Sequence, residues 1–141
     1  VSSNAGDGIE ADGILALSHT TVSGNGGDGI YGRGVAPLAM TVGSSIIAGD
    51  CTGVIAVTSE GYNIESTGIT CGLDQPTDLS AVADLSLGPL QNNGGPTETH
   101  GLLEGSVAVD RIPSEMCAAS EDQRGVARPQ GIACDVGALE I

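Results

Sequence analysis

The sequence contains no lysine, phenylalanine or tryptophan, and only two tyrosines. Its four arginines stand against eighteen acidic residues, which gives a formal net charge of −14 over 141 residues. A surface of this charge repels nucleic acid and anionic lipid, so neither is an expected partner. The scarcity of aromatic rings also argues against a carbohydrate site built on aromatic stacking.

Long apolar runs and helical periodicity are missing too. No stretch approaches 18 apolar residues, so membrane insertion is not expected, and the N-terminus does not read as a signal peptide. No window places apolar residues at helical spacing over ten residues. Instead, short apolar and β-branched runs alternate with Gly, Asn, Asp and Ser, and the chain holds 23 glycines. This pattern predicts an all-β fold of short strands with tight corners.

A repeat of 21 residues opens the chain. Residues 1–14 share eight identities with residues 22–35. Residues 15–25 match residues 40–50 at a spacing of 25, and we assign the four extra residues to 36–39. Periods of this length are typical of solenoids, and three short strands per repeat predict a right-handed parallel β-helix.

Equivalent residues of such a stack lie about 4.8 Å apart on neighbouring rungs. The spacing therefore predicts aliphatic ladders, which form the core: Val1 with Val22 and Ile47, Ile9 with Ile30, Leu15 with Met40, and Leu17 with Val42. It also predicts a polar line at one corner, made by Asn4, Asn25 and Asp50, whose side chains can bond to the neighbouring rung.

We expect residues 1–72 to form coils of a longer solenoid and residues 73–141 to form a final irregular coil and a C-terminal cap. The uncovered strand edges of the first coil indicate either a longer solenoid or a piece that stacks on a partner. A disulfide-stapled cap laid across the other end would keep the last coil from pairing with another strand. The edges of the first coil also predict end-to-end β-stacking of copies, a contact that does not close and so builds fibres.

The four cysteines are Cys51, Cys71, Cys117 and Cys134. They lack C-x-x-C spacing and neighbouring histidines, which disfavours a zinc site. Sequential pairing, Cys51 with Cys71 and Cys117 with Cys134, would close two local loops in the irregular part of the chain. Disulfides at these positions predict a location outside the cytoplasm, and four free thiols are the alternative.

The C-terminal half carries a long signature. Residues 87–110 read Leu-Gly-Pro-Leu-Gln-Asn-Asn-Gly-Gly-Pro-Thr-Glu-Thr-His-Gly-Leu-Leu-Glu-Gly-Ser-Val-Ala-Val-Asp, and Cys117, residues 122–125, Arg128-Pro129 and residues 134–140 follow. This run resembles the terminal module of the choice-of-anchor Q domain family, bacterial right-handed parallel β-helix proteins with a pectin-lyase-like fold. The coil phrases at residues 23–25 and 45–49 are similar to those of the same family.

The resemblance implies a secreted or cell-surface location and no common reaction. We accordingly expect a structural or adhesive protein, not an enzyme, with no catalytic, cofactor-binding or metal residues assigned. The alternative is the C-terminal portion of a pectin-lyase-like polysaccharide lyase or glycoside hydrolase. A lyase needs a basic residue beside its carboxylates, yet Arg33 alone is available in the coils, where it aligns with Asp12.

Three polar features of the sequence invite an interpretation. The repeat places Asp7 and Asp28 on neighbouring rungs, where calcium could lie between them, or where both simply serve tight Gly-Asp-Gly corners. His100 is predicted to anchor the cap by hydrogen bonds. Arg124 is predicted to hold the cap loops through nearby carboxylates, which are those of Asp110, Asp122, Asp135 and Glu140.

Overall fold

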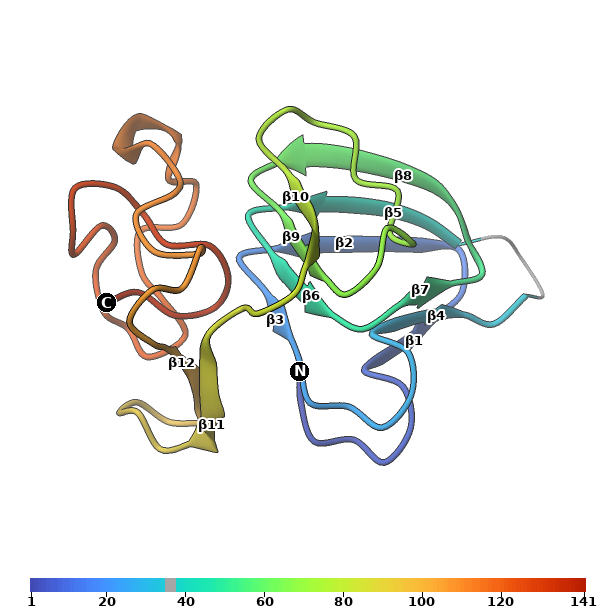
Figure 1. The fold of residues 1–141 in the computed structure, drawn as a ribbon, viewed down its shortest axis with the longest axis horizontal. Coiled ribbons are helices and arrows are strands. Elements are labelled where there is room, and N and C mark those ends of the chain that lie inside the picture. The colour runs from blue at the N-terminus through green and yellow to red at the C-terminus, as the bar shows by residue number, and fades with distance from the viewer. Residues whose placement is uncertain (35–37) are drawn as a thin grey trace.

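The computed structural model describes residues 1–34 and 38–141. Over these residues the chain is all-β, with twelve strands and one short 3-10 helix at Ser114–Met116 (Figure 1). The strands are β1 (Ile9–Ala11), β2 (Ile14–Ser18), β3 (Thr21–Val22), β4 (Ile30–Gly32), β5 (Leu38–Gly43), β6 (Ile46–Ala48), β7 (Cys51–Thr52), β8 (Val54–Gly61), β9 (Ile64–Ser66), β10 (Leu79–Val82), β11 (Leu87–Gln91) and β12 (Thr99–Leu102). No helix in the described ranges is long and apolar enough to cross a membrane.

Ten strands form three parallel sheets, in the orders β1-β4-β7, β2-β5-β8 and β10-β9-β6-β3. Each strand therefore pairs with its counterpart one repeat away, and we call one passage through the three sheets a coil. The registers confirm the predicted ladders: Ile9 pairs with Ile30, Leu15 with Met40, Leu17 with Val42 and Val22 with Ile47. Ser2 bridges to Ser23, which places Val1 beside Val22.

The spacing between paired residues changes from 21 to 25 at the position that the sequence repeat predicts. Ala11 pairs with Gly32 at a spacing of 21, and Ile14 pairs with Ala39 at a spacing of 25. The four extra residues therefore lie between Gly32 and Ala39, and part of the predicted segment 36–39 falls outside the described residues.

The predicted polar line is correct for its first two members only. Asn4 donates through its backbone N–H and its side-chain amide to Asn25 Oδ1, at 3.1 and 3.0 Å. Asp50 lies elsewhere, because its carbonyl accepts from Ile30 N at 3.1 Å and Ile30 pairs with Cys51. The corner after β6 is four residues shorter than the corner after β3, so Asp50 lies beside the end of that longer corner and not beside Asn25.

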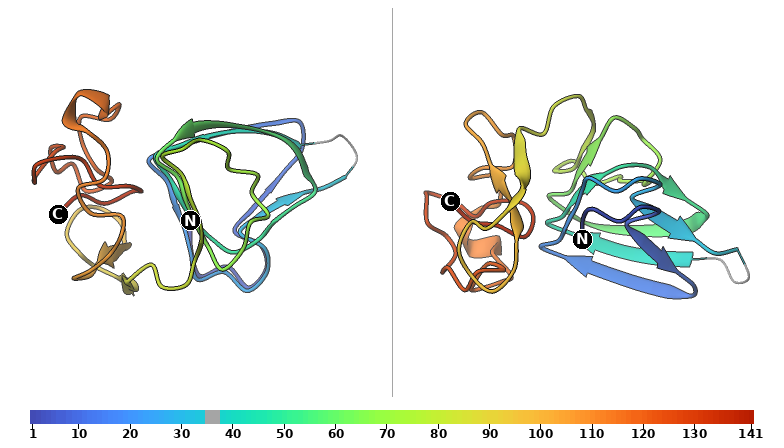
Figure 2. Two further views of the ribbon diagram at one scale, coloured as in Figure 1. Left: turned by 45° about the horizontal axis from the view of Figure 1, so that its top comes forward. Right: turned by 90° about the horizontal axis from the view of Figure 1, so that it is seen from below.

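Seen along the stack, the three sheets enclose a triangular interior (Figure 2, left). Alternate side chains of each strand point inward, as the pleat of a strand requires. They form a buried apolar cluster, and its members are Ile30, Leu38, Met40, Val42, Ile47, Cys51 and Cys71. This cluster is the core that the ladders predict.

The sheet β10-β9-β6-β3 is apolar on its outer face as well. Ile47 belongs to the interior cluster, whereas its neighbour Ile46 belongs to a second cluster together with Ile64. Residues 83–141, which we call the C-terminal module, complete this second cluster with Leu85, Leu102, Ala108, Ile112, Cys134 and Val136. A sheet that is apolar on both faces must be covered on both faces, and the module supplies the outer cover.

The C-terminal module consequently lies along the side of the coil stack, not across its end as predicted (Figure 2). Gly137 N donates to Ser44 O at 2.9 Å, and Ala138 N donates to Thr21 Oγ1 at 3.0 Å. These bonds reach β3 and the turn before β6, on successive coils. The prediction of an end cap was wrong because the sequence pattern does not show that Ile46 and Ile64 point away from the interior.

A different segment, residues 67–78, covers one end of the stack. It is joined to β7 by the disulfide between Cys51 and Cys71, and Thr70 Oγ1 accepts from Cys51 N at 2.9 Å. Leu73 packs against the interior cluster. The segment leads into β10, which still pairs with β9 in the parallel sheet although it follows the predicted boundary at residue 72.

Candidate functional site

The side chain of Asp7 is used by the corner of the next coil. Asp28 N donates to Asp7 Oδ1 at 2.7 Å, and a Cβ at Gly27 would lie 2.2 Å from the same oxygen. The close approach explains why glycine is present at position 27. Among the residues described, no group of three or more potential metal ligands occurs. Calcium binding at Asp7 and Asp28 stays a prediction.

Arg33 forms an exposed ion pair with Glu10 on the neighbouring coil. Its backbone N–H donates to Ala11 O at 3.1 Å, so its backbone follows the predicted register beside Asp12. The side chain reaches Glu10 instead, because residues at alternate positions of a strand share a face. The guanidinium is therefore neutralised locally, as expected for an arginine outside any basic stripe.

Both disulfides follow the sequential pairing: Cys51 with Cys71, and Cys117 with Cys134. No cysteine is left free. Cys71 and Cys134 are fully buried. Two disulfides indicate an oxidising environment of the extracellular type.

Arg124 is held by one of the four predicted carboxylates. Its Nε donates to Asp122 Oδ2 at 2.9 Å, and a terminal nitrogen donates to Asn93 O at 3.2 Å. The other terminal nitrogen donates to the backbone carbonyl of Glu140, not to its carboxylate. The prediction was correct for Asp122 and wrong for the carboxylates of Glu140, Asp110 and Asp135, which have other partners.

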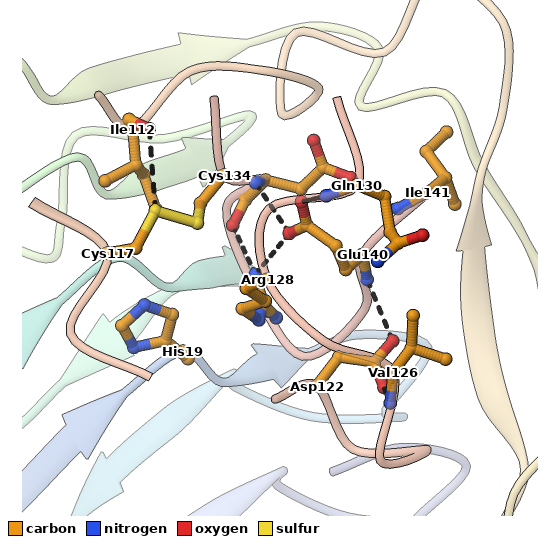
Figure 3. A network of polar contacts seen from close by, with 12 residues as sticks. His19, Ile112, Cys117, Asp122, Val126, Arg128, Gln130, Cys134, Glu140 and Ile141 are labelled. Atoms are coloured by element: carbon orange, nitrogen blue, oxygen red, sulfur yellow. Dashed lines mark hydrogen bonds and ion pairs between the residues drawn. A yellow bond between two sulfur atoms is a disulfide. The ribbon is translucent and has the colours of Figure 1, made fainter. Parts of the chain in front are cut away.

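The arginine that reaches the Glu140 carboxylate is Arg128. Its Nη1 donates to Glu140 Oε2 at 2.9 Å and to Asp135 O at 2.7 Å (Figure 3). Its Nη2 donates to Gly137 O at 2.6 Å. The Glu140 carboxylate also accepts from Gln130 N and Asp135 N, each at 2.9 Å. This network ties the last residues of the chain into the interior of the module.

The surroundings of Asp122, Asp135 and Arg128 shift their pKa values. Although burial alone would raise the pKa of Asp122, hydrogen bonds from Val126 N, the Arg124 side chain and Glu140 N lower it. Burial is the main reason why the pKa of Asp135 is raised. Burial also lowers the pKa of Arg128, and the neighbouring carboxylates act in the opposite direction. Hydrogen-bond donors of the protein occupy most of the carboxylate oxygens of Asp122, Asp135 and Glu140.

His100 makes a hydrogen bond of the predicted kind. Its Nδ1 lies 2.8 Å from Gly88 O, which joins β12 to β11. Its ring also lies 3.8 Å from where a Cβ of Gly24 would be, beside the corner that follows β3. His100 therefore fixes the hairpin and lies against the coils.

A groove of about 520 Å³ lies where β3 meets the C-terminal module. The coils line it with Val1, His19, Thr20 and Thr21, and the module lines it with Glu121, Asp122, Gln123, Arg128 and Ala138. His19 has a positive φ of 46° at the corner before β3, and its Nδ1 lies 2.9 Å from Ser18 Oγ. Its Nε2 and the Nε of Arg128 are buried without partners.

Burial, followed by the charge of Arg128, lowers the pKa of His19, while Glu140 acts in the opposite direction. A neutral imidazole therefore faces the buried guanidinium where the coils meet the module (Figure 3). The arrangement is a polar joint between the two parts of the chain.

The sequence interpretation did not identify His19, Arg128 or the groove. Arg128 and Glu140 both belong to the signature, but their spacing of twelve residues in irregular chain gives no reason to pair them. Comparison with models of protein families, with curated proteins and with solved structures finds no match.

Proposed function

We propose that this protein is a secreted or cell-surface structural or adhesive protein. In this proposal the three parallel sheets are the faces of a right-handed parallel β-helix, and the family it resembles is the choice-of-anchor Q domain. In-register parallel pairing across all three sheets supports the fold. The two disulfides support the extracellular location.

The observation that carries the adhesive role is the outer face of the sheet β2-β5-β8. Two rows of residues cross it in register, Ile14 with Ala39 and Ala56, and Ala16 with Thr41 and Thr58. These rows contain no charge in a chain of net charge −14. Ile14 is 86% exposed although it lies in a strand. Two uncharged rows on an acidic body suit a contact with a neutral surface, and the exposed Glu60, whose carboxylate lies beside Gly43, borders these rows.

Binding to immobilised polysaccharides tests this role. A panel of neutral and acidic polysaccharides is incubated with the protein, and both retention and new reducing or unsaturated ends are measured. We expect retention on neutral polymers without products, and Thr41→Glu should abolish retention because it puts a charge in the centre of the face. Thr52→Glu, on the neighbouring sheet, is the matched control. Release of products would favour the enzyme alternative. Equal retention of both variants would show that this face is not the binding surface.

The two ends of the stack differ, which limits the proposed end-to-end stacking. Residues 67–78 cover one end, so strand edges are offered mainly by β1, β2 and β3 at the other. A fibre needs two complementary ends. Among the described strands, those with an unpaired edge away from residues 67–78 are β1, β2 and β3.

A further inference from the structure

The outer face of the sheet β10-β9-β6-β3 changes from large to small side chains toward the carboxyl ends of its strands. Ile46 and Ile64 fill the space beneath the C-terminal module. Two residues further on, the same face carries Ala48 and Ser66, which pair with each other. Ser23 continues β3 beside Ala48 in the same row. A cleft of about 240 Å³ lies at this row and is lined by Ser23 and Ser66.

We call this hollow the serine cleft, and its full lining is Ser23, Ser66, Thr67 and residues 83–87.

The wall opposite the sheet, residues 83–87, is held in place by the rest of the module. Asp84 Oδ1 accepts from Ser86 N at 2.7 Å, and Ser86 O accepts from Leu103 N at 2.9 Å. Leu85 is 8% exposed and belongs to the second apolar cluster. The wall is therefore preformed, which lowers the entropy cost of binding a ligand.

The serine hydroxyl groups of the cleft are available to a ligand. Ser66 is 8% exposed, yet its Oγ makes no hydrogen bond with another described residue. The Oγ atoms of Ser23 and Ser86 also have no protein partner within the described part of the chain. Thr67 Oγ1, by contrast, donates to Ser66 O at 2.8 Å. Because polar groups in a nearly buried side chain are normally paired, Ser66 points to a ligand in the cleft.

The lining groups define the chemical class of this ligand. A serine hydroxyl both donates and accepts, which matches the hydroxyl groups of a sugar. Asp84 brings the one charge of the lining, so an anionic ligand is disfavoured, and a single carboxylate is too few for calcium. Leu85 and Leu87 offer apolar atoms to the C–H groups of a sugar ring. Sites for drug-sized ligands measure about 300 to 1,000 Å³, so this smaller cleft suits one ring.

We propose that the serine cleft binds one uncharged sugar residue. The hydroxyls of Ser23, Ser66 and Ser86 bond to hydroxyls of the sugar, and the second carboxylate oxygen of Asp84 accepts from another. The cleft lies on a different sheet from the outer face of β2-β5-β8, so the inference goes beyond the proposed function and does not rest on it. One residue in one cleft binds weakly, and retention on an immobilised polymer still requires that outer face.

The test is an NMR titration of the isotopically labelled protein with the methyl glycosides of glucose, galactose and mannose. We expect at least one of them to cause saturable shifts of the amide signals of Ser66, Thr67 and residues 84–86. We expect glucuronate and galacturonate to bind at least about tenfold more weakly, because their carboxylates meet Asp84 in an acidic protein.

Two variants assign the binding to this cleft. Ser66→Val fills the cleft and removes its hydroxyl, and should weaken binding by at least about tenfold. Ser86→Ala removes a hydroxyl from the opposite wall and should also weaken binding. Alanine suits this position, since Ala81 has a φ of 56° and Ser86 a φ of 47°. Ser80→Ala, which removes an exposed hydroxyl from β10, is the matched control and should bind like the parent protein.

The proposal would be overturned by the absence of saturable shifts with all three glycosides, or by shifts confined to residues outside the cleft. Unchanged affinity in both Ser66→Val and Ser86→Ala would overturn it as well. Equal binding of the uronates would show that the cleft does not select uncharged sugars, which also contradicts it. Thr41→Glu should leave the titration unchanged, so the adhesive role and the serine cleft stand or fail separately.

Discussion

Arg128 and Glu140 form an ion pair with an N–O distance of 2.9 Å, and their side chains are 1% and 0% exposed. A buried charge that loses its partner is costly, because neither water nor another charge compensates it. Glu140 also accepts from Gln130 N and Asp135 N, so its carboxylate organises three parts of the C-terminal module.

We therefore predict that Glu140→Gln lowers the free energy of unfolding by about 3 kcal/mol. The amide keeps the shape of the side chain but leaves the Arg128 charge uncompensated. Urea unfolding followed by circular dichroism gives the value. Glu121→Gln, at an exposed position of the same module, is the control and should change little. If both variants unfold at the same urea concentration, the ion pair has no structural role.

A second prediction concerns the outer face of the sheet β10-β9-β6-β3. Ile46 is fully buried beneath the C-terminal module, and Ile46→Ala should destabilise the protein by about 2 to 4 kcal/mol because it leaves a cavity. Ile14→Ala removes the same atoms from a side chain that is 86% exposed and should change stability little. Equal effects in a thermal unfolding experiment would mean that the module does not pack on this face.

The two disulfides should stabilise different parts of the chain. They close loops with sequence separations of 20 and 17, which corresponds to about 3 kcal/mol each in the loop-entropy model. Replacing Cys51 and Cys71 by alanine should increase amide exchange in residues 67–78 and β7. Replacing Cys117 and Cys134 should increase exchange inside the C-terminal module. Identical exchange maps for the two double variants would contradict this division.

The sequence predicted the coils better than the module. Repeats of 21 and 25 residues fix which residues pair, because a parallel stack brings equivalent positions together, and Ile9 with Ile30 and Leu15 with Met40 follow directly. Asp50 was misplaced beside Asn25 because the corner after β6 is shorter. A corner can lose residues without disturbing the strands, so identity at a corner is a weaker guide to register than identity within a strand.

The position of the C-terminal module could not be read from the sequence. Ile46 and Ile47 are adjacent apolar residues, and a pattern alone does not show that one faces the interior while the other faces the module. The partners of Arg124 and Arg128 also depend on irregular loops, in which no periodicity relates position to direction. The sequence paired Arg124 correctly with Asp122 alone, and the structure assigns the buried carboxylate of Glu140 to Arg128.

The joint between coils and module should weaken in mild acid through His19. Burial and the Arg128 charge lower the pKa of His19 in the folded protein, whereas the unfolded chain titrates near pH 6.5. Between these two values the unfolded state binds more protons, so the stability from neutral His19 is present above about pH 6.5 and is lost as the pH falls. The imidazolium would face Arg128, with Glu140, Asp122 and Glu121 as the nearby acids.

His19→Asn tests this dependence, since asparagine tolerates the positive φ of 46° and carries no titrating charge. Stability is measured by urea unfolding from pH 7.5 to pH 4.5 for both proteins, and their difference isolates His19 from Asp135, whose raised pKa acts in the opposite sense. We expect the parent protein to lose more stability than the variant between pH 6.5 and pH 5. Because the pKa of Asp122 is lowered, its contribution to folding stability is lost only at lower pH, near and below about 4. Parallel curves for the two proteins across this range would show that His19 does not control the joint.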